Sequence, residues 1–98
     1  MIKNSKVVVF GRKTCPHCKA AYFTAECLQT EGEIKSCCFK PVEDRNRWME
    51  KHRISDEEVK SVKSYMTVPQ IFVGKKFIGG NSEFQKLVRE QIGPACTA

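Results

Sequence analysis

The chain has 98 residues and a formal net charge of +6, and this length suits one compact domain over residues 1–98 rather than two independent hydrophobic cores. Its lysine and arginine residues are scattered without a dense basic block or interleaved aromatic residues, which disfavours a nucleic-acid-binding surface. No segment approaches the ~18 consecutive apolar residues of a membrane span, and the N-terminus lacks the apolar stretch of a secretory signal, so we expect a soluble, monomeric protein of the cytoplasm.

The N-terminal third of the chain shows a strand pattern and then a helix pattern. Residues 6–10 are a β-branched apolar run closed by Gly11, which is typical of a strand covered on both faces and central in a sheet. From residue 16 to about residue 30, apolar residues recur at helical spacing, and this predicts a helix that ends before Gly32. Cys18 belongs to the apolar stripe, so we expect its side chain to face the core.

The middle of the chain gives a weaker pattern. Residues 34–39 are typical of a second strand that Pro41 ends, and the polar stretch 43–53 suits either a short helix or a loop. Residues 55–58 read Ser-Asp-Glu-Glu, a capping box that predicts the start of another helix. The apolar face of that helix is expected to consist of Val59, Val62 and Met66.

The last third of the chain predicts a hairpin and a final helix. Residues 70–73 and 76–78 are short strand patterns, and the two-residue connection Gly74-Lys75 between them is typical of a tight antiparallel turn. Ser82 and Gln85 repeat the spacing of a capping box, which predicts that a helix begins there. Its apolar side is expected to consist of Phe84, Leu87 and Val88.

The order of the predicted elements indicates a fold class. It reads β-α-β-α-β-β-α, with a parallel βαβ unit early in the chain and a hairpin late in it. Connections between such elements are usually short, and the crossover between parallel strands is right-handed. These rules favour a single mixed sheet flanked by helices. We therefore expect an α/β fold built on a mixed four-stranded sheet.

Cys15 and Cys18 enclose Pro16 and His17 in a Cys-x-x-Cys motif. Because proline is favoured at the first helical position, Cys15 becomes the N-cap residue. There its sulfur can accept hydrogen bonds from the N–H groups of His17 and Cys18, and the helix dipole lowers its pKa while Cys18 stays a thiol. Two sulfurs on one helical turn can close a disulfide reversibly. The motif predicts a redox pair with Cys15 as nucleophile and Cys18 as resolving cysteine, tuned by Pro16 and His17.

Metal binding is the main alternative interpretation of this motif in a chain with six cysteines. A zinc site needs a second pair of ligands, and the adjacent Cys37 and Cys38 would point to opposite faces of a strand. An iron–sulfur cluster is disfavoured because Pro16 stiffens the loop around the thiols. We expect mostly free thiols in a reducing compartment: one of Cys37 and Cys38 packs in the core, Cys27 is a partly exposed bystander, and Cys96 lies in a frayed tail.

Three ordered segments carry further motifs: Phe-Gly-Arg-Lys-Thr-Cys-Pro-His-Cys at 10–18, Thr-Val-Pro-Gln-Ile-Phe-Val at 67–73 and Phe-Ile-Gly-Gly-Asn-Ser-Glu at 77–83. In order and rough spacing they resemble the active-site, TVP and GG segments of the dithiol glutaredoxins. The resemblance weakens between residues 32 and 65, and His17 stands where the family usually has Tyr or Phe. It implies a thioredoxin-like fold and a single glutaredoxin domain.

The resemblance also implies a binding site for glutathione. The family's proline maps onto Pro69, whose peptide bond should be cis and which should lie against the active-site cysteines. The glycines at 79–80 would let a ligand approach the backbone, and the helix start after them would bind the γ-glutamyl carboxylate. A basic residue ahead of the motif would meet the glycyl carboxylate. The implied glutathione-binding residues are Arg12, Lys13, Thr67, Val68, Pro69, Gly80, Asn81, Ser82 and Glu83.

The activity that the resemblance implies is glutathione-dependent reduction of protein disulfides and protein–glutathione mixed disulfides, in electron transport and cell redox homeostasis. Glutathione would be a co-substrate, no tightly bound cofactor or metal is expected, and ribonucleotide reductase is a partner that related proteins serve. Two alternatives stay open. Cys-Pro-His-Cys also resembles the motif of periplasmic thiol oxidases, although the signal peptide and helical insertion expected there are not visible. A metal-carrying or scaffold protein on the same fold is the non-enzymatic alternative.

Overall fold

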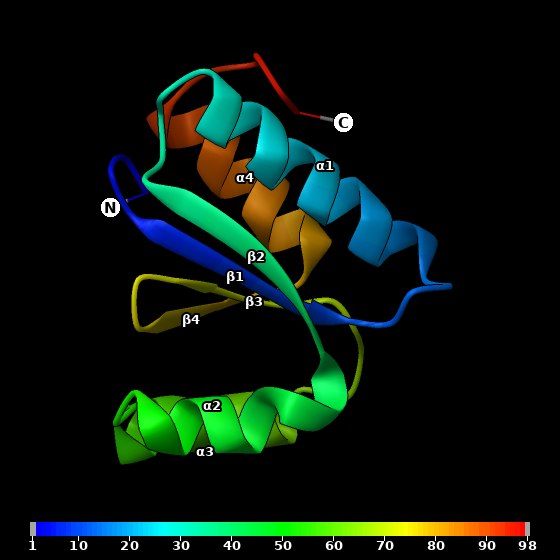
Figure 1. Cartoon of the computed structure of the whole chain (residues 1–98), viewed down its shortest axis with the longest axis vertical. Coiled ribbons are helices and arrows are strands. Elements are labelled where there is room, and N and C mark those ends of the chain that lie inside the picture. Colours follow the sequence, from blue (N-terminus) through cyan, green and yellow to red (C-terminus); the bar gives the residue numbers. More distant parts are fainter. Residues whose placement is uncertain (1, 98) are drawn as a thin grey trace.

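A four-stranded mixed sheet separates two layers of helices (Figure 1). The computed structural model describes residues 2–97. The strand order is β2-β1-β3-β4, where β1 pairs in parallel with β2 and antiparallel with β3, and β3 and β4 form the antiparallel hairpin. The predicted α/β fold with a mixed sheet is confirmed. The strand bounds are β1 Lys6–Gly11, β2 Ser36–Pro41, β3 Gln70–Val73 and β4 Lys76–Gly79.

Strand β1 is an inner strand of the sheet, and helices cover both of its faces, as its apolar run predicts. Val7 and Val9 belong to one core cluster, whereas Val8 and Phe10 belong to the other. All four side chains are buried. β2 begins at Ser36 rather than at residue 34, and it forms one edge of the sheet.

Helices α1 (Pro16–Thr30) and α4 (Asn81–Gln91) cover one face of the sheet (Figure 1). The predicted span of α1 is confirmed, and Ala21, Ala25 and Leu28 of its apolar stripe are fully buried. In the part of the chain that the structure describes, no helix is long and apolar enough to cross a membrane.

Helix α4 begins in a different way from the prediction. Gly80, not Ser82, is its N-cap residue, and the Glu83 side chain accepts a hydrogen bond of 2.7 Å from the backbone N–H of Gly80. The Gln85 amide, expected to close the cap, donates instead to the Thr24 hydroxyl at 2.9 Å. The predicted capping box at residues 82 and 85 is therefore wrong, because the helix begins two residues earlier and Glu83 closes its first turn.

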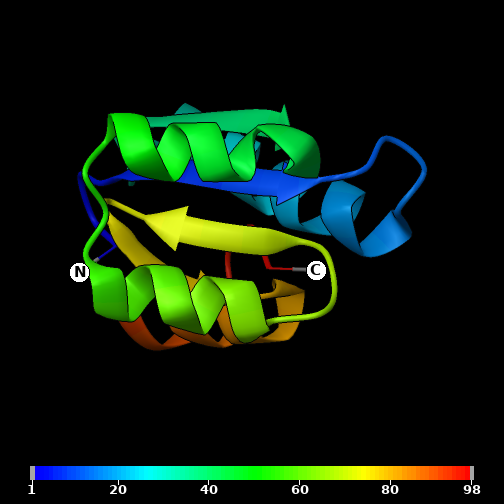
Figure 2. The ribbon, with the colours of Figure 1, turned by 90° about the horizontal axis from the view of Figure 1, so that it is seen from below.

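Three helical segments cover the opposite face of the sheet (Figure 2): η1 (Val42–Asp44), α2 (Arg45–Lys51) and α3 (Asp56–Ser64). The stretch 43–53, for which a helix and a loop were both open, is thus mainly helical. Trp48 anchors it to the sheet, since its ring lies 5.4 Å from the Phe10 ring and 4.8 Å from the Phe72 ring between centroids. Aromatic contact of this kind holds a short helix that propensity alone would leave marginal.

The start of α3 follows its sequence signature. Ser55 is the N-cap residue, and its hydroxyl accepts a hydrogen bond of 3.3 Å from the backbone N–H of Glu58. The Glu58 carboxylate accepts from the backbone N–H of Phe77 at 2.8 Å, which ties α3 to β4. Met66 was expected on the apolar face of this helix, but α3 ends at Ser64 and Met66 is 88% exposed.

The C-terminal tail is bound to α1 by a disulfide between Cys27 and Cys96. The two Cα atoms are 5.6 Å apart, although the cysteines are 69 positions apart in the chain. Gly93, with a positive φ of 130°, lets the chain turn back after α4, and Ile92 and Cys96 pack against the core cluster beneath α1. The expectations of a bystander Cys27 and a frayed tail with a free Cys96 are both wrong.

Candidate active site

Cys15 is the N-cap residue of α1. Its backbone is extended, Pro16 follows at the start of the helix, and its Sγ accepts a hydrogen bond of 3.2 Å from the backbone N–H of Cys18. Of the two donors predicted for this sulfur, Cys18 makes the hydrogen bond. The backbone N–H of Cys15 donates to the Arg12 carbonyl at 3.2 Å, which fixes the turn before the helix. Neither Cys15 nor Cys18 is in a disulfide, so the pair is in its dithiol form.

Cys18 is the buried member of the pair, with an exposed fraction of 0%. Burial, and next the hydrogen bond with Cys15, raise the pKa of the Cys18 thiol to about 11. Cys18 is therefore a thiol at neutral pH, as predicted. Its sulfur packs against Gly11, where an added Cβ would lie only 2.6 Å from Sγ. Sequence reasoning took Gly11 only as the end of a strand and missed this packing role.

A cavity of about 340 Å³ lies beside the motif. It brings together residues of three distant segments, and the Val68–Pro69 peptide bond within it is cis, as predicted. Most of the residues implied to bind glutathione thus share one cavity with one residue of the Cys-x-x-Cys motif. The lining consists of His17, Tyr65, Thr67, Val68, Pro69, Gly80, Asn81, Ser82 and Glu83.

Tyr65 is a lining residue that sequence reasoning missed. Its hydroxyl donates to the Glu83 carboxylate at 3.3 Å, and the same oxygen accepts from the backbone N–H of Gly80. A Cβ at Gly80 would lie 2.5 Å from the Tyr65 hydroxyl and 3.3 Å from the Pro69 carbonyl. Because Gly80 has no Cβ, the Tyr65 side chain and the cis-proline loop can pack against its backbone. The available signal was an aromatic residue two positions before Thr67.

Arg12 and Lys13 do not line the cavity of Pro69. They are exposed and border another cavity, of about 450 Å³, together with Phe39, Pro41 and Glu43. The Glu43 carboxylate offsets part of their positive charge there. The residues implied to bind glutathione are thus divided between two cavities.

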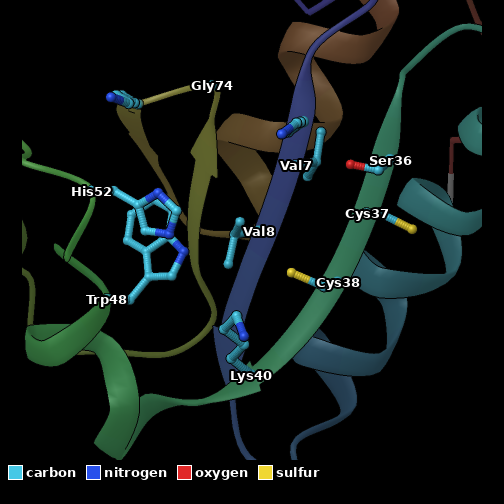
Figure 3. Close-up of a pocket in the computed structure, with 11 residues that line it drawn as sticks. Val7, Val8, Ser36, Cys37, Cys38, Lys40, Trp48, His52 and Gly74 are labelled. Carbon is cyan, nitrogen blue, oxygen red and sulfur yellow. The ribbon is translucent and has the colours of Figure 1, made fainter.

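Cys37 and Cys38 point to opposite faces of β2, as predicted (Figure 3). Cys37 packs at the margin of the cluster under α1 and donates to the Gln29 amide oxygen at 3.0 Å, and burial raises the pKa of its thiol. Cys38 packs at the margin of the other cluster. Both are half-buried, so the expectation that one packs in the core is wrong. Among residues 2–97, no three His, Cys, Asp or Glu side chains are grouped to hold a metal ion.

A half-buried cysteine at a helix N-terminus, a buried thiol one turn later and a neighbouring cis-proline cavity together suit thiol–disulfide exchange. The fold and this site define a thiol–disulfide oxidoreductase. Because neither cysteine is held in a disulfide with another part of the chain, the pair can cycle between dithiol and disulfide.

Comparison with known proteins agrees with this class. The glutaredoxin family model matches residues 7–78. A glutaredoxin of Haemophilus influenzae is 39% identical over 87 residues, which are 89% of this chain and 94% of the relative. Glutaredoxin 1 of Escherichia coli is 36% identical, over 89% of this chain and 96% of the relative. The NMR structure of oxidized Escherichia coli glutaredoxin has a TM-score of 0.64 and 31% identity, covering 91% of this chain and 99% of that one. The chain belongs to the glutaredoxin family.

Proposed function

We propose that this glutaredoxin is a glutathione-dependent reductase of protein disulfides and of protein–glutathione mixed disulfides. The observation that carries the proposal is the asymmetry of the cysteine pair. Cys15 is half-buried at a helix N-terminus, whereas Cys18 is fully buried and its pKa is raised. A reachable sulfur near free helix N–H groups suits attack on a substrate, and a protonated buried sulfur suits a second, intramolecular attack.

On a protein–glutathione mixed disulfide, Cys15 is sufficient. Its thiolate attacks the glutathione sulfur, the S–S bond of the substrate breaks, and the protein thiolate leaves and takes up a proton. Cys15 then carries glutathione. The thiolate of a second glutathione attacks the sulfur of the bound one, releases glutathione disulfide and restores the Cys15 thiolate.

On a disulfide within a protein, both cysteines act. Cys15 attacks one sulfur and stays bonded to the substrate, while the other substrate sulfur leaves as a thiol. Cys18 then loses its proton and attacks the Cys15 sulfur, which frees the substrate and leaves a Cys15–Cys18 disulfide. One glutathione opens this disulfide by forming a mixed disulfide on Cys15, and a second removes it as glutathione disulfide.

The cavity beside Pro69 offers complementary groups for one end of glutathione. The first N–H groups of α4, at Asn81 and Ser82, have no partner within the helix and suit the γ-glutamyl carboxylate. The Glu83 carboxylate in the same cavity suits the ammonium group. The extended backbone at Val68 suits strand-like pairing with the peptide part of glutathione.

Residues of the loop before α1 complete the proposed site. Arg12 or Lys13 would meet the glycyl carboxylate from the adjoining cavity. Pro16 and His17 would tune the reduction potential, because an imidazole beside the Cys15 thiolate favours the reduced form.

The cellular setting follows from the same proposal. Glutathione is abundant in the reduced form in the cytoplasm, so we place the protein there, with the Cys27–Cys96 disulfide as an exception to the usual scarcity of disulfides in that compartment. We also propose that it is a monomer that serves cell redox homeostasis. Its partners would be glutathione and disulfide-bearing or glutathionylated proteins, with ribonucleotide reductase as one protein substrate.

A coupled assay tests the proposal, with NADPH consumption by glutathione reductase as the readout. Arg12→Glu removes a cation, and Ser82→Pro removes an N–H donor at a first-turn position that tolerates proline. Each should raise the apparent KM for glutathione by roughly ten- to hundredfold, since a charge-assisted hydrogen bond is lost. Lys86→Glu, an exposed change elsewhere on α4, is the matched control and should leave this KM unchanged.

Two results would contradict the proposal. One is wild-type glutathione kinetics in both Arg12→Glu and Ser82→Pro. The other is efficient reduction of the protein by thioredoxin reductase but not by glutathione, which would leave the dithiol chemistry intact and remove glutathione as the donor.

A further inference from the structure

A cavity of about 430 Å³ lies on the face of the sheet opposite to α1 and α4, between α2 and the strands β1 and β2 (Figure 3). Val8, Cys38 and Trp48 give it apolar walls. Neither active-site cysteine and none of the residues proposed to bind glutathione lines it. It is therefore a separate feature of the surface.

The hollow results from the side chains that β2 presents to this face. Cys38 lies opposite Val8 in the parallel register, and alternation along the strand puts Ser36 on the same face. These side chains are small, whereas Phe10 and Trp48 fill the neighbouring part of the face with rings 5.4 Å apart. Large side chains therefore cover this face of the sheet over β1 and β3, whereas the small side chains of β2 leave a cavity.

The surroundings of this cavity are cationic. No carboxylate belongs to its lining, and within residues 2–97 none of its lysines forms an ion pair. A smaller neighbouring cavity, which shares Lys40, Trp48 and His52, adds Arg47 and Lys51 against the single carboxylate of Asp44. This arrangement favours an anionic occupant. The lysine and histidine residues that line the larger cavity are Lys6, Lys40, His52 and Lys75.

Strand β2 also has a free edge beside the cavity. In the described part of the chain it pairs only with β1. The backbone N–H and C=O groups on its other side can pair with an added extended segment, whose alternate side chains would then point into the cavity. A second copy of this chain suits the edge poorly, because two such edges would bring the same lysines together.

The edge leads toward the active site. Pro41, the last residue of β2, is the register partner of Gly11, which packs against Cys18. A strand added along the whole of β2 would be about 20 Å long at the usual rise per residue. One of its ends would lie near the loop that carries Cys15.

We propose that the free edge of β2 and its cationic cavity dock an acidic, extended segment of the protein substrate, with an apolar side chain in the cavity and carboxylates against the lysines. The proposal rests on the proposed function, because docking there serves to deliver a substrate disulfide to Cys15. Small glutathione disulfides need no such contact.

Binding is measured first, without any redox step. Trp48 is the single tryptophan of the chain, so its fluorescence reports on the cavity. The probe is an extended peptide as long as β2, with Glu residues flanking a Leu and with no Trp or Cys. It should change Trp48 emission saturably and more weakly at high salt. The same peptide with Gln in place of Glu, or N-methylated on the amides that face β2, should bind at least about tenfold more weakly.

The variant Lys40→Glu/Lys75→Glu should lose binding of the acidic peptide by about tenfold or more. Lys63→Glu/Lys86→Glu carries the same charge change on α3 and α4, outside the cavity, and should bind normally. If Lys40→Glu/Lys75→Glu lowers folding stability, the milder Lys40→Gln/Lys75→Gln gives the same comparison.

Activity then connects docking to catalysis. A disulfide substrate that carries the acidic segment should be reduced with a kcat/KM about tenfold higher than one with the Gln segment, and Lys40→Glu/Lys75→Glu should abolish that advantage. Reduction of a small glutathione mixed disulfide should be the same in all variants. Absence of glutathione-coupled activity on any substrate would refute the proposed function while the fluorescence arm still decides whether the peptide docks.

Several results would overturn the docking proposal. One is equal binding of the Glu and Gln peptides. Others are tighter binding of a single-stranded oligonucleotide than of the peptide, and full replacement of the peptide's effect by inorganic pyrophosphate. A β2-mediated dimer in sedimentation, broken by Lys40→Glu/Lys75→Glu, would assign the edge to a second copy.

Discussion

Each end of helix α1 carries one member or both members of a cysteine pair, and the two pairs differ in bonding state and in sequence separation. At the N-terminus, Cys15 and Cys18 lie on one helical turn, unbonded and linked by a hydrogen bond of 3.2 Å from the Cys18 N–H to the Cys15 sulfur. At the other end, Cys27 is bonded to Cys96 across 69 positions of the chain. A local pair opens and closes with little change in chain freedom, whereas a distant pair restricts the unfolded chain. The first suits catalysis and the second suits stability.

Removal of the nucleophile should have the largest effect and sharpens the comparison most. Cys15→Ser should lower every thiol–disulfide activity by about a thousandfold or more, because Cys15 is the free sulfur at the helix N-terminus and its partner Cys18 is fully buried. Cys27→Ser should retain near wild-type activity in the same coupled assay. Substantial activity in Cys15→Ser would show that the catalytic pair is misassigned, and loss of activity in Cys27→Ser would break the division of roles.

Removal of the resolving cysteine should affect one substrate class only. Cys18→Ser should still reduce a small glutathione mixed disulfide, because glutathione itself resolves the adduct on Cys15. It should fail on a disulfide within a protein, where the trapped substrate needs an intramolecular attack. Parallel assays of the two substrates measure the difference, and equal loss on both would mean that Cys18 is needed for more than resolution.

Removal of the distant pair should affect stability rather than catalysis. In the chain-entropy view, opening a loop of this length by Cys27→Ser lowers the free energy of unfolding by about 4 kcal/mol. Guanidinium unfolding of the wild type and of Cys27→Ser, both with Cys15 and Cys18 reduced, measures the difference. Cys96→Ser should give the same loss, and the double variant should add nothing further. Additive losses would show that the two sulfurs act separately.

The raised pKa of Cys18 predicts that folding stability falls at high pH, which is the smallest of the expected effects. In the unfolded chain this thiol ionises near its ordinary pKa of 9.0, whereas in the folded protein burial raises the pKa to about 11. The folded state therefore holds the proton more tightly, so the contribution to stability is complete below pH 9.0 and is lost as the pH rises toward about 11. Tyr22 and Cys37 have raised pKa values too and act in the same direction.

Comparison of the reduced wild type with Cys18→Ala isolates this effect. Denaturation between pH 8 and pH 11 should show a steeper decline for the wild type than for the variant, as the pKa of about 11 for Cys18 requires. Equal slopes would mean that Cys18 ionises in the folded protein as it does in the unfolded chain.

Local patterns made much of the fold predictable. The apolar run of β1, the proline that opens α1 and the two-residue turn at 74–75 each depend on neighbours in sequence, and each is confirmed. The same holds for the N-cap position of Cys15 and the inward direction of Cys18. These features are determined by backbone sterics and side-chain periodicity over a few residues.

The failures involve contacts between distant segments. The bond between Cys27 and Cys96 depends on the path of the tail after α4, which no local pattern contains. Tyr65 joins the cis-proline cavity only because β4 and α4 bring Glu83 to its hydroxyl. The cavity along β2 likewise depends on where α2 packs, and the sequence left open whether α2 was a helix at all. Tertiary packing decided each of these features.

The most direct test of the central claim is to trap the nucleophile. Cys18→Ser is exposed briefly to glutathione disulfide near neutral pH, and the glutathione adduct is located by mass spectrometry of peptides. We predict a single adduct on Cys15 with the Cys27–Cys96 disulfide intact, because Cys15 is the free sulfur at the helix N-terminus. An adduct that forms first on Cys37, Cys38 or an opened Cys27 would contradict the assignment of Cys15 as the attacking cysteine.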